Sequence, residues 1–145
     1  SYFSRSEFMK TGRKRVNRKE IRRMLFEMTN FGEKWTEQNF SAEDEYLVKF
    51  TERRIIENLL ENGQKVLVDN ISVTAASRKL YLQIAEKMNR TVGVIFLDTP
   101  VITCIERNRM LDDPVPEAII SNLAAGKAVP TRSEGFRDVL ILTDY

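Results

Sequence analysis

Two carboxylates in this chain stand where a parallel sheet would present them to a ligand. Asp69 follows the apolar run Val66-Leu67-Val68, and Asp98 ends a second apolar run that starts at Val92. In an open parallel sheet, the carboxyl ends of the strands face the ligand crevice. A carboxylate there can hold a Mg²⁺-bound water beside a nucleotide. Phosphate transfer is therefore the first chemistry to consider.

The residue types that are missing narrow the chemistry further. The phosphate cradle G-x-x-x-x-G-K-[ST] does not occur in these 145 residues. There is no histidine, which excludes His-based triads, zinc sites built on histidine and histidine general bases. Carboxylates, lysine, arginine and bound metal remain as chemical tools. The single cysteine, Cys104, excludes an internal disulfide and is compatible with a reducing compartment, so we expect a cytoplasmic location.

Composition indicates one globular domain over residues 1–145. Hydrophobic residues make up 42% and charged residues 30%, and the length suffices for a real core. No apolar run approaches the length of a membrane span, so we expect no membrane partner. The net charge is only +2, but nine basic residues fall between positions 5 and 23. That cluster could bind a polyanion. Charge alone slightly favours a solvated helix face with a basic loop.

Short apolar strands alternate with helical segments along the chain. We expect strands at residues 14–17, 65–69, 92–98 and 138–142, with the third strand fully buried. We expect helices at 1–9, 18–28, 42–62, 74–89, 101–109 and 116–125. Thr99 is the predicted N-cap of the fifth helix and Pro100 its first residue. This alternation predicts an α/β fold with a parallel sheet in three layers.

Seven segments occur in an order that carries a family resemblance. They are RVNRKEIR (15–22), KVLVD (65–69), SRK (77–79), VIFLD (94–98), CIERNR (104–109), VPE (115–117) and SEGFRDV (133–139). Together they resemble the P-loop ATP-dependent kinases of the polynucleotide 5′-hydroxyl kinase group and related AAA-type repair kinases. The resemblance implies a P-loop kinase fold, ATP and Mg²⁺ as cofactors, and transfer of the γ-phosphate to a hydroxyl acceptor. A nucleic acid 5′ end is one such acceptor.

The same resemblance implies roles for particular residues. Asp69 would be catalytic, orienting the acceptor hydroxyl or a metal-bound water, and Arg107 would be catalytic at the phosphates. Mg²⁺ would be held by Ser1 and Asp69. The nucleotide and its phosphates would be bound by Ser1, Arg107, Arg109, Gly135 and Phe136. The acceptor would be bound by Asn17, Arg18 and Arg22. A lid would cover residues 110–116.

The chain departs from the family's pattern in four places, one of which is Ile71-Ser72, where the family typically has a Thr-Asn pair. The family's first strand and glycine-rich loop precede the position of Ser1, so we expect that the chain begins after a missing segment. Lys19 stands where the family usually has an acidic general base, and an ammonium group accepts no proton unless its pKa is strongly depressed. The lid is poor in arginine and carries Asp112 and Asp113.

Three hypotheses about function follow from these observations. The first is an ATP-dependent kinase whose acceptor is a nucleic acid end or a smaller hydroxyl compound. The second is a catalytically degenerate kinase-like domain that binds nucleotide, RNA or a protein partner. The third is a nucleic-acid-binding module that uses the basic residues 5–23. We favour the first for the gene product, and the sequence does not indicate an oligomeric state.

Overall fold

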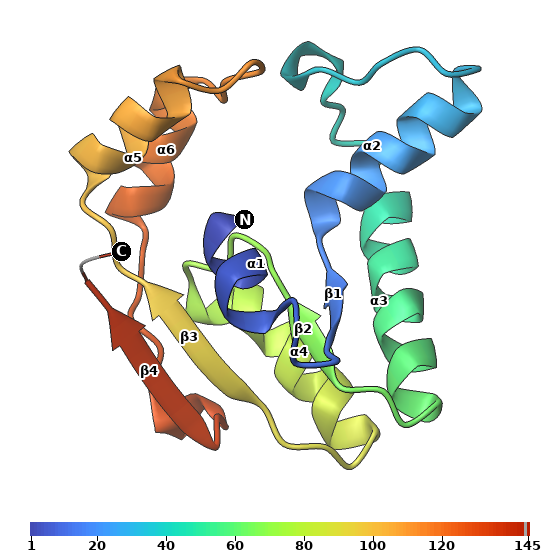
Figure 1. The fold of residues 1–145 in the computed structure, drawn as a ribbon, viewed down its shortest axis with the longest axis vertical. Coiled ribbons are helices and arrows are strands. Elements are labelled where there is room, and N and C mark those ends of the chain that lie inside the picture. The colour runs from blue at the N-terminus through green and yellow to red at the C-terminus, as the bar shows by residue number, and fades with distance from the viewer. Residues whose placement is uncertain (144) are drawn as a thin grey trace. The chain divides into compact units, whose positions relative to one another are not determined.

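Two parallel two-stranded sheets, one in each half of the chain, organise the fold (Figure 1). The computed structural model describes residues 1–143 and residue 145. The chain divides into two compact units, Ser1–Ile71 and Ser72–Tyr145, and each contains one of the sheets. The α/β class with parallel strands is confirmed, in the form of two small sheets.

The first unit contains three α-helices, a short 3-10 helix and two strands among the described residues. In chain order they are α1 (Tyr2–Phe8), β1 (Lys14–Val16), α2 (Arg18–Thr29), η1 (Glu37–Asn39), α3 (Glu45–Glu61) and β2 (Val66–Val68). Strands β1 and β2 pair in parallel, with Lys14 opposite Val66 and Val16 opposite Val68. Parallel pairing requires a crossover, and the segment from α2 to α3 provides it.

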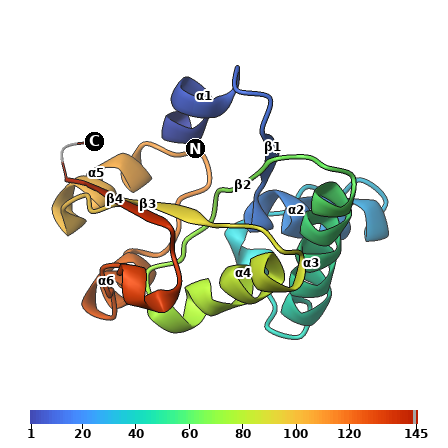
Figure 2. The ribbon, with the colours of Figure 1, turned by 90° about the horizontal axis from the view of Figure 1, so that it is seen from below.

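Helix α3 packs against α2 and against both strands of the first unit (Figures 1 and 2). Its buried face carries Val48, Glu52 and Ile56 at helical spacing, and Ile21 of α2 and Val16 of β1 are buried as well. Asn17 begins α2, because its extended backbone lets its side chain accept a hydrogen bond from the Glu20 amide. The carboxyl end of β1 is thereby joined directly to the start of a helix.

The second unit has the same alternation of helices and strands. Its elements are α4 (Ala75–Lys87), β3 (Gly93–Leu97), α5 (Val101–Arg109), α6 (Glu117–Ala125), η2 (Arg132–Glu134) and β4 (Asp138–Leu142). Strand β3 pairs in parallel with β4, from Gly93 opposite Asp138 to Leu97 opposite Leu142. Helices α5 and α6 pack against each other, and residues 110–116, the expected lid, connect them without a helix or strand.

Two local predictions about the second unit are wrong. Strand β3 is not fully buried: Phe96 is, but Ile95 is 36% and Leu97 39% exposed, because a two-stranded sheet gives each strand few neighbours. The N-cap of α5 is Pro100 rather than Thr99, and the helix begins at Val101. The reason is the extended ψ of 140° at Pro100, which keeps that residue out of the helix. None of the helices in the described residues is long and apolar enough to cross a membrane.

Candidate functional site

Asp69 lies directly after β2 and gathers donors from three parts of the first unit. Its backbone amide donates to the Val16 carbonyl at 2.9 Å, so the pairing of β1 and β2 continues to this residue. Its carboxylate accepts hydrogen bonds from Ser4 Oγ at 2.7 Å and from Arg15 Nε at 2.7 Å. Ser1 donates to it through Oγ at 3.2 Å and through its ammonium group at 3.0 Å. Asp69 is therefore in direct contact with Ser1 and Ser4, at the start of α1.

These donors keep Asp69 ionised. Burial would raise the pKa of this carboxyl, but the hydrogen bonds from Ser4, Arg15 and the Ser1 ammonium outweigh burial and lower the pKa to about 2. Arg15 also donates through Nη1 to Glu20 Oε1 at 2.8 Å. Burial would lower the pKa of Arg15, and its bonds to Glu20 and Asp69 raise it instead. Asp69 is therefore a permanent anion near neutral pH.

A buried network fixes the backbone on the other side of Asp69. Asn17 Nδ2 donates to the Asp69 carbonyl at 2.6 Å, and the Arg18 amide donates to Asn70 Oδ1 at 2.7 Å. Arg18 Nε and Asn70 Nδ2 both donate to the carboxylate of Glu52. The side chain of Glu52 is 0% exposed. The start of α2, the middle of α3 and the loop after β2 are thereby joined at a single carboxylate.

The remaining cations on this face of α2 are paired with carboxylates as well. Lys19 Nζ lies 2.6 Å from Glu37 Oε1. Arg22 makes a two-pronged contact with Glu45, through Nε at 2.5 Å and Nη2 at 3.1 Å. Arg18 and Arg22, which the resemblance assigns to an acceptor phosphate, thus already hold the carboxylates of Glu52 and Glu45.

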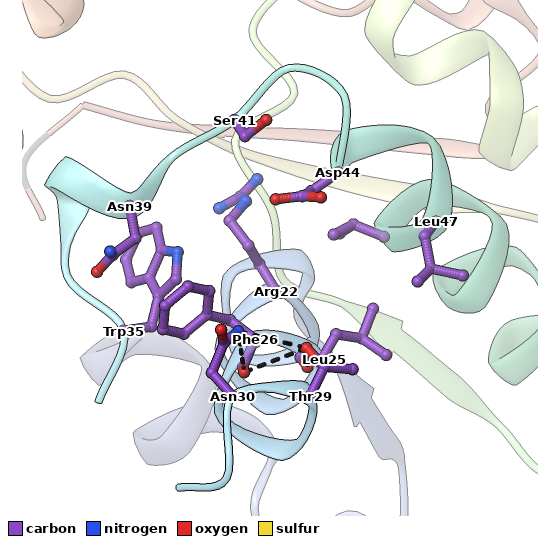
Figure 3. Close-up of a pocket in the computed structure, with 11 residues that line it drawn as sticks. Arg22, Leu25, Phe26, Thr29, Asn30, Trp35, Asn39, Ser41, Asp44 and Leu47 are labelled. Atoms are coloured by element: carbon purple, nitrogen blue, oxygen red, sulfur yellow. Dashed lines mark hydrogen bonds between the residues drawn. The ribbon is translucent and has the colours of Figure 1, made fainter. Parts of the chain in front are cut away.

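A cavity of about 260 Å³ lies beside these ion pairs, between α2, the segment before α3, and α3 itself (Figure 3). Trp35 and Phe26 lie next to each other on one side of it, and Arg22 and Asp44 lie on another. Its lining consists of Arg22, Leu25, Phe26, Thr29, Asn30, Trp35, Asn39, Ser41, Asp44, Leu47 and Val48. The wall thus combines five apolar or aromatic side chains with four neutral polar ones and two charged ones, Arg22 and Asp44.

The candidate residues of the second unit have partners within that unit. Asp98, at the end of β3, accepts from Lys127 Nζ at 2.5 Å. Arg107 Nη1 donates to the Tyr145 carbonyl at 2.9 Å. Arg109 binds both oxygens of Glu117, at 2.6 and 3.2 Å, and its hydrogen bond lowers the pKa of that carboxyl.

The turn that carries Gly135 and Phe136 is held by a buried arginine. Arg78, only 3% exposed, donates through Nε and Nη2 to Glu134 at 3.0 and 3.1 Å, and through Nη1 to the Ser72 carbonyl at 3.0 Å. The hydrogen bond from Arg78 lowers the pKa of Glu134. Gly135 has a φ of +119°, which a residue with a side chain adopts only under strain, and the ring of Phe136 is buried.

The structure brings some of the sequence-predicted residues together and leaves others in a separate group. Asp69, Ser1 and Asn17 are in direct contact, and Arg18 joins them through Asn70. The nucleotide candidates of the second unit, Arg107, Arg109, Gly135 and Phe136, form no such cluster around one group. Sequence reasoning missed Ser4, Arg15, Glu52, Glu45 and Arg78. Only Glu52 leaves a signal, a charge four residues from both Val48 and Ile56 on an otherwise apolar helix face.

The oxygen atoms around Asp69 are of the kind that Mg²⁺ takes. Among the described residues, no three His, Cys, Asp or Glu side chains gather into a metal cluster. Mg²⁺ in nucleotide sites, however, needs only one or two protein oxygens, because phosphates and water complete its shell. Ser1 Oγ and Asp69 Oδ1, 3.2 Å apart, fit that requirement.

One comparison with known proteins finds a family whose model matches this chain. The family model described as "AAA domain" matches residues 1–128. That range includes the whole first unit and most of the second. No curated protein matches the chain.

Proposed function

Because the chain belongs to the AAA domain family, we propose that it works as an ATP-dependent phosphotransferase that moves a γ-phosphate to a hydroxyl acceptor. The family is of the P-loop NTPase-like kinase type, which supports nucleotide binding and kinase-like activity. We also propose a three-layer parallel sheet, ATP and Mg²⁺ as cofactors, and a nucleic acid 5′ end as one acceptor.

The observation that carries this proposal is the contact between Ser1 and Asp69. In P-loop enzymes, a hydroxyl at the start of a helix and an aspartate at the end of a strand together hold Mg²⁺. Here the hydroxyl of Ser1, the N-cap of α1, donates to the Asp69 carboxylate beyond β2. Two residues that are 68 positions apart in the chain thus meet in the arrangement that this chemistry needs.

In this mechanism, Asp69 orients groups rather than removing a proton. Its pKa of about 2 makes it a weak base at neutral pH, and phosphoryl transfer through a loose transition state needs little base assistance. Ser4 and Arg15 hold the carboxylate in place, and Asn17 holds its backbone. Mg²⁺, when bound at Ser1 and Asp69, would supply charge neutralisation at the phosphates. For Arg107 and Arg109, in the second unit, the resemblance to P-loop kinases proposes contact with the nucleotide phosphates.

A second candidate is a kinase-like domain that binds without turnover. The observation that favours it is the ion pair of Lys19 with Glu37, at the position where the family usually has an acidic base. Glu20, the next residue, is bound to Arg15. Neither side chain is placed to accept a proton from an acceptor.

The experiment that separates the two candidates offers γ-labelled ATP with 5′-hydroxyl RNA, 5′-hydroxyl DNA and a panel of small alcohols. Label in any acceptor, lost in Asp69→Asn and retained in Glu61→Gln, supports the phosphotransferase. Glu61 is a suitable control because it is an exposed carboxylate at the end of α3 with no assigned role at the site. RNA retention without labelling, lost when Arg18 and Arg22 are replaced by alanine, would favour the binder instead.

A further inference from the structure

We propose that the acceptor side of the first unit binds an uncharged, ring-containing hydroxyl compound in the cavity beside Trp35, and not a phosphate-rich strand. The inference rests on the proposed function, because it names the class of acceptor for that function. Three features of the first unit support it: the pairing of its cations, the chemistry of the cavity wall and the size of the cavity.

The cations that could attract a polyanion on this face of α2 are each neutralised by a carboxylate. Arg18 is held by buried Glu52, Lys19 by Glu37, and Arg22 by both oxygens of Glu45. Affinity for nucleic acid depends on cations that release counterions from phosphates when they bind. A cation that must first leave its own carboxylate contributes much less to such binding.

Aromatic rings hold two of these cations in place. Lys19 Nζ lies 5.5 Å from the centre of the Trp35 ring. The guanidinium carbon of Arg22 lies 6.0 Å from the Trp35 ring and 5.3 Å from the Phe40 ring. Cation–π attraction adds to each ion pair, so turning either side chain toward a phosphate would break two interactions at once.

The surroundings of the cavity do not favour an anion. Leu25, Phe26, Leu47 and Val48 provide its apolar wall, and Trp35, which is only 3% exposed, adds a small aromatic surface. The charged residues in the lining are Arg22 and Asp44, and Arg22 is already held by Glu45. An added phosphate would therefore meet a cation that is already paired and a carboxylate that repels it. A neutral ring can lie against Phe26 and the aliphatic side chains, and its hydroxyl groups can bond to neutral groups such as those of Asn39 and Ser41.

The volume of the cavity sets the size of the compound. At about 260 Å³, the cavity is slightly smaller than those that hold drug-sized molecules, which start at roughly 300 Å³. One ring system with a few substituents is of suitable size. A strand of nucleic acid is too large for the cavity, whereas a single nucleoside is of suitable size.

Trp35 gives a direct measurement, because it is the only tryptophan in the chain and it lines the cavity. We would titrate the protein with adenosine, uridine and phenyl glucoside as uncharged ring compounds, and with AMP as the charged partner of adenosine. The expected result is a saturable change in tryptophan emission with at least one uncharged compound, and binding of AMP about fivefold or more weaker than that of adenosine, since repulsion by carboxylates opposes its phosphate. No response to any uncharged compound would overturn the proposal. Tighter binding of AMP or of a 5′-hydroxyl oligonucleotide would overturn it too.

Two pairs of variants test the location and the charge argument. Ser41→Phe should fill the cavity and abolish the response, whereas Ser6→Phe, on the exposed side of α1, should not. Glu45→Gln should release Arg22 and improve AMP binding, whereas Glu43→Gln should leave it unchanged, because Glu43 is exposed and makes no ion pair in the part of the chain described here. An unchanged AMP affinity in Glu45→Gln would contradict the charge argument.

The fluorescence titration does not depend on catalysis. If an uncharged compound binds beside Trp35 and no acceptor is ever phosphorylated, the cavity proposal survives and the phosphotransferase proposal fails. If phosphorylation occurs only on a nucleic acid end and no uncharged compound binds, the outcome is reversed. The two proposals therefore fail separately.

Discussion

At the scale of single residues, Asp69 is the group whose ionisation the first unit stabilises most clearly. Its pKa of about 2 lies below the usual value near 3.9 for an unfolded chain. The ionised carboxyl therefore contributes its full stabilisation at pH values above the unfolded pKa, and this stabilisation is lost as the pH falls through the folded pKa. The shift corresponds to roughly 2 kcal/mol. The difference in unfolding free energy between the wild type and Asp69→Asn should therefore shrink as the pH is lowered from about 5 to 2.

Chemical denaturation at a series of pH values provides that measurement. Asp112→Asn is the control, because this exposed carboxyl lies in the segment between α5 and α6, far along the chain from the donors of Asp69. The unfolding free energy of Asp112→Asn should differ little from that of the wild type at every pH. A gap for Asp69→Asn that stays constant down to pH 2 would show that the contacts with Ser4 and Arg15 do not depend on the charge.

Arg107 allows a test of catalysis by a single residue. If it acts on the phosphoryl group in transit, Arg107→Ala should lower kcat by about 10³-fold while changing the KM for ATP far less, because the charge it meets develops in the transition state. Steady-state kinetics with an acceptor that becomes labelled in the γ-labelled ATP assay would measure both constants. Arg13→Ala, an exposed arginine before β1, is the matched control. An effect confined to KM would assign Arg107 to ground-state binding only.

Some of the residues around Asp69 could be predicted from sequence, and others could not. Asp69 is found because it follows a short apolar strand, and strand ends have a fixed place in parallel sheets. Asn17 is found only through the resemblance of residues 15–22 to a kinase motif, because the strand before it, Lys14–Val16, is mostly charged. Ser4 and Arg15 leave no such mark. Their roles depend on which way a side chain turns after the chain has folded, and a serine in a short helix has the same local sequence wherever it points.

At the scale of elements, α2 and α3 are joined by charge as much as by apolar packing. Glu52 occupies a buried helix position where an apolar residue would be usual, and it accepts from Arg18 and Asn70. Burying a carboxylate costs free energy that its partners must offset, and removing one partner leaves the other charge uncompensated. The sequence pattern predicts both helices well, but it does not predict the ionic contact between them.

Replacing Glu52 tests this connection between the helices. Glu52→Ala should lower the free energy of unfolding by about 3 kcal/mol, because Arg18 and Asn70 both lose their acceptor. Glu52→Gln should lower it less, since the amide oxygen still accepts one hydrogen bond. Glu61→Ala, at the exposed end of α3, should change it by less than about 0.5 kcal/mol. An Arg18→Ala, Glu52→Ala double mutant whose losses simply add would mean that the two side chains are not coupled.

The errors of element prediction have local physical causes. The bounds of α5 agree with the expected 101–109, but its N-cap was missed by one residue because Pro100 keeps an extended backbone, although proline is also common as the first residue of a helix. The apolar sequence of β3 resembles a buried central strand, yet a strand is only as buried as its neighbours make it, and β3 pairs with β4 alone among the described strands. Pairing partners are a property of the fold that a single segment does not contain.

At the scale of the whole molecule, the family match extends through both units, whereas the sequence motif that binds the triphosphate in such families does not occur. The match to the AAA domain family covers residues 1–128 and so runs through both units. The glycine-rich cradle that normally binds the triphosphate occurs in neither unit. The order of segments along the chain predicted a family of the P-loop kinase type. The division into two units could not be predicted, because the residues around positions 71 and 72 do not have the composition of a linker.

ATP binding by the 145 residues should therefore be weak, with a dissociation constant above about 1 mM, because backbone N–H groups and one lysine of the cradle normally supply most triphosphate contacts. Adding a strand and a G-x-x-x-x-G-K segment directly before Ser1 should tighten binding of ATP·Mg²⁺ by about tenfold or more. Calorimetry on both proteins measures the change, and the same extension with alanine in place of its lysine is the control. Ser1 and Asp69 would then lie beside the added phosphate-binding loop. Asp69→Asn should therefore weaken ATP binding in the extended protein but not in the 145-residue chain. Tight binding of ATP by the 145 residues themselves would show instead that the triphosphate is held by other groups, and the role given to Ser1 would fall with it.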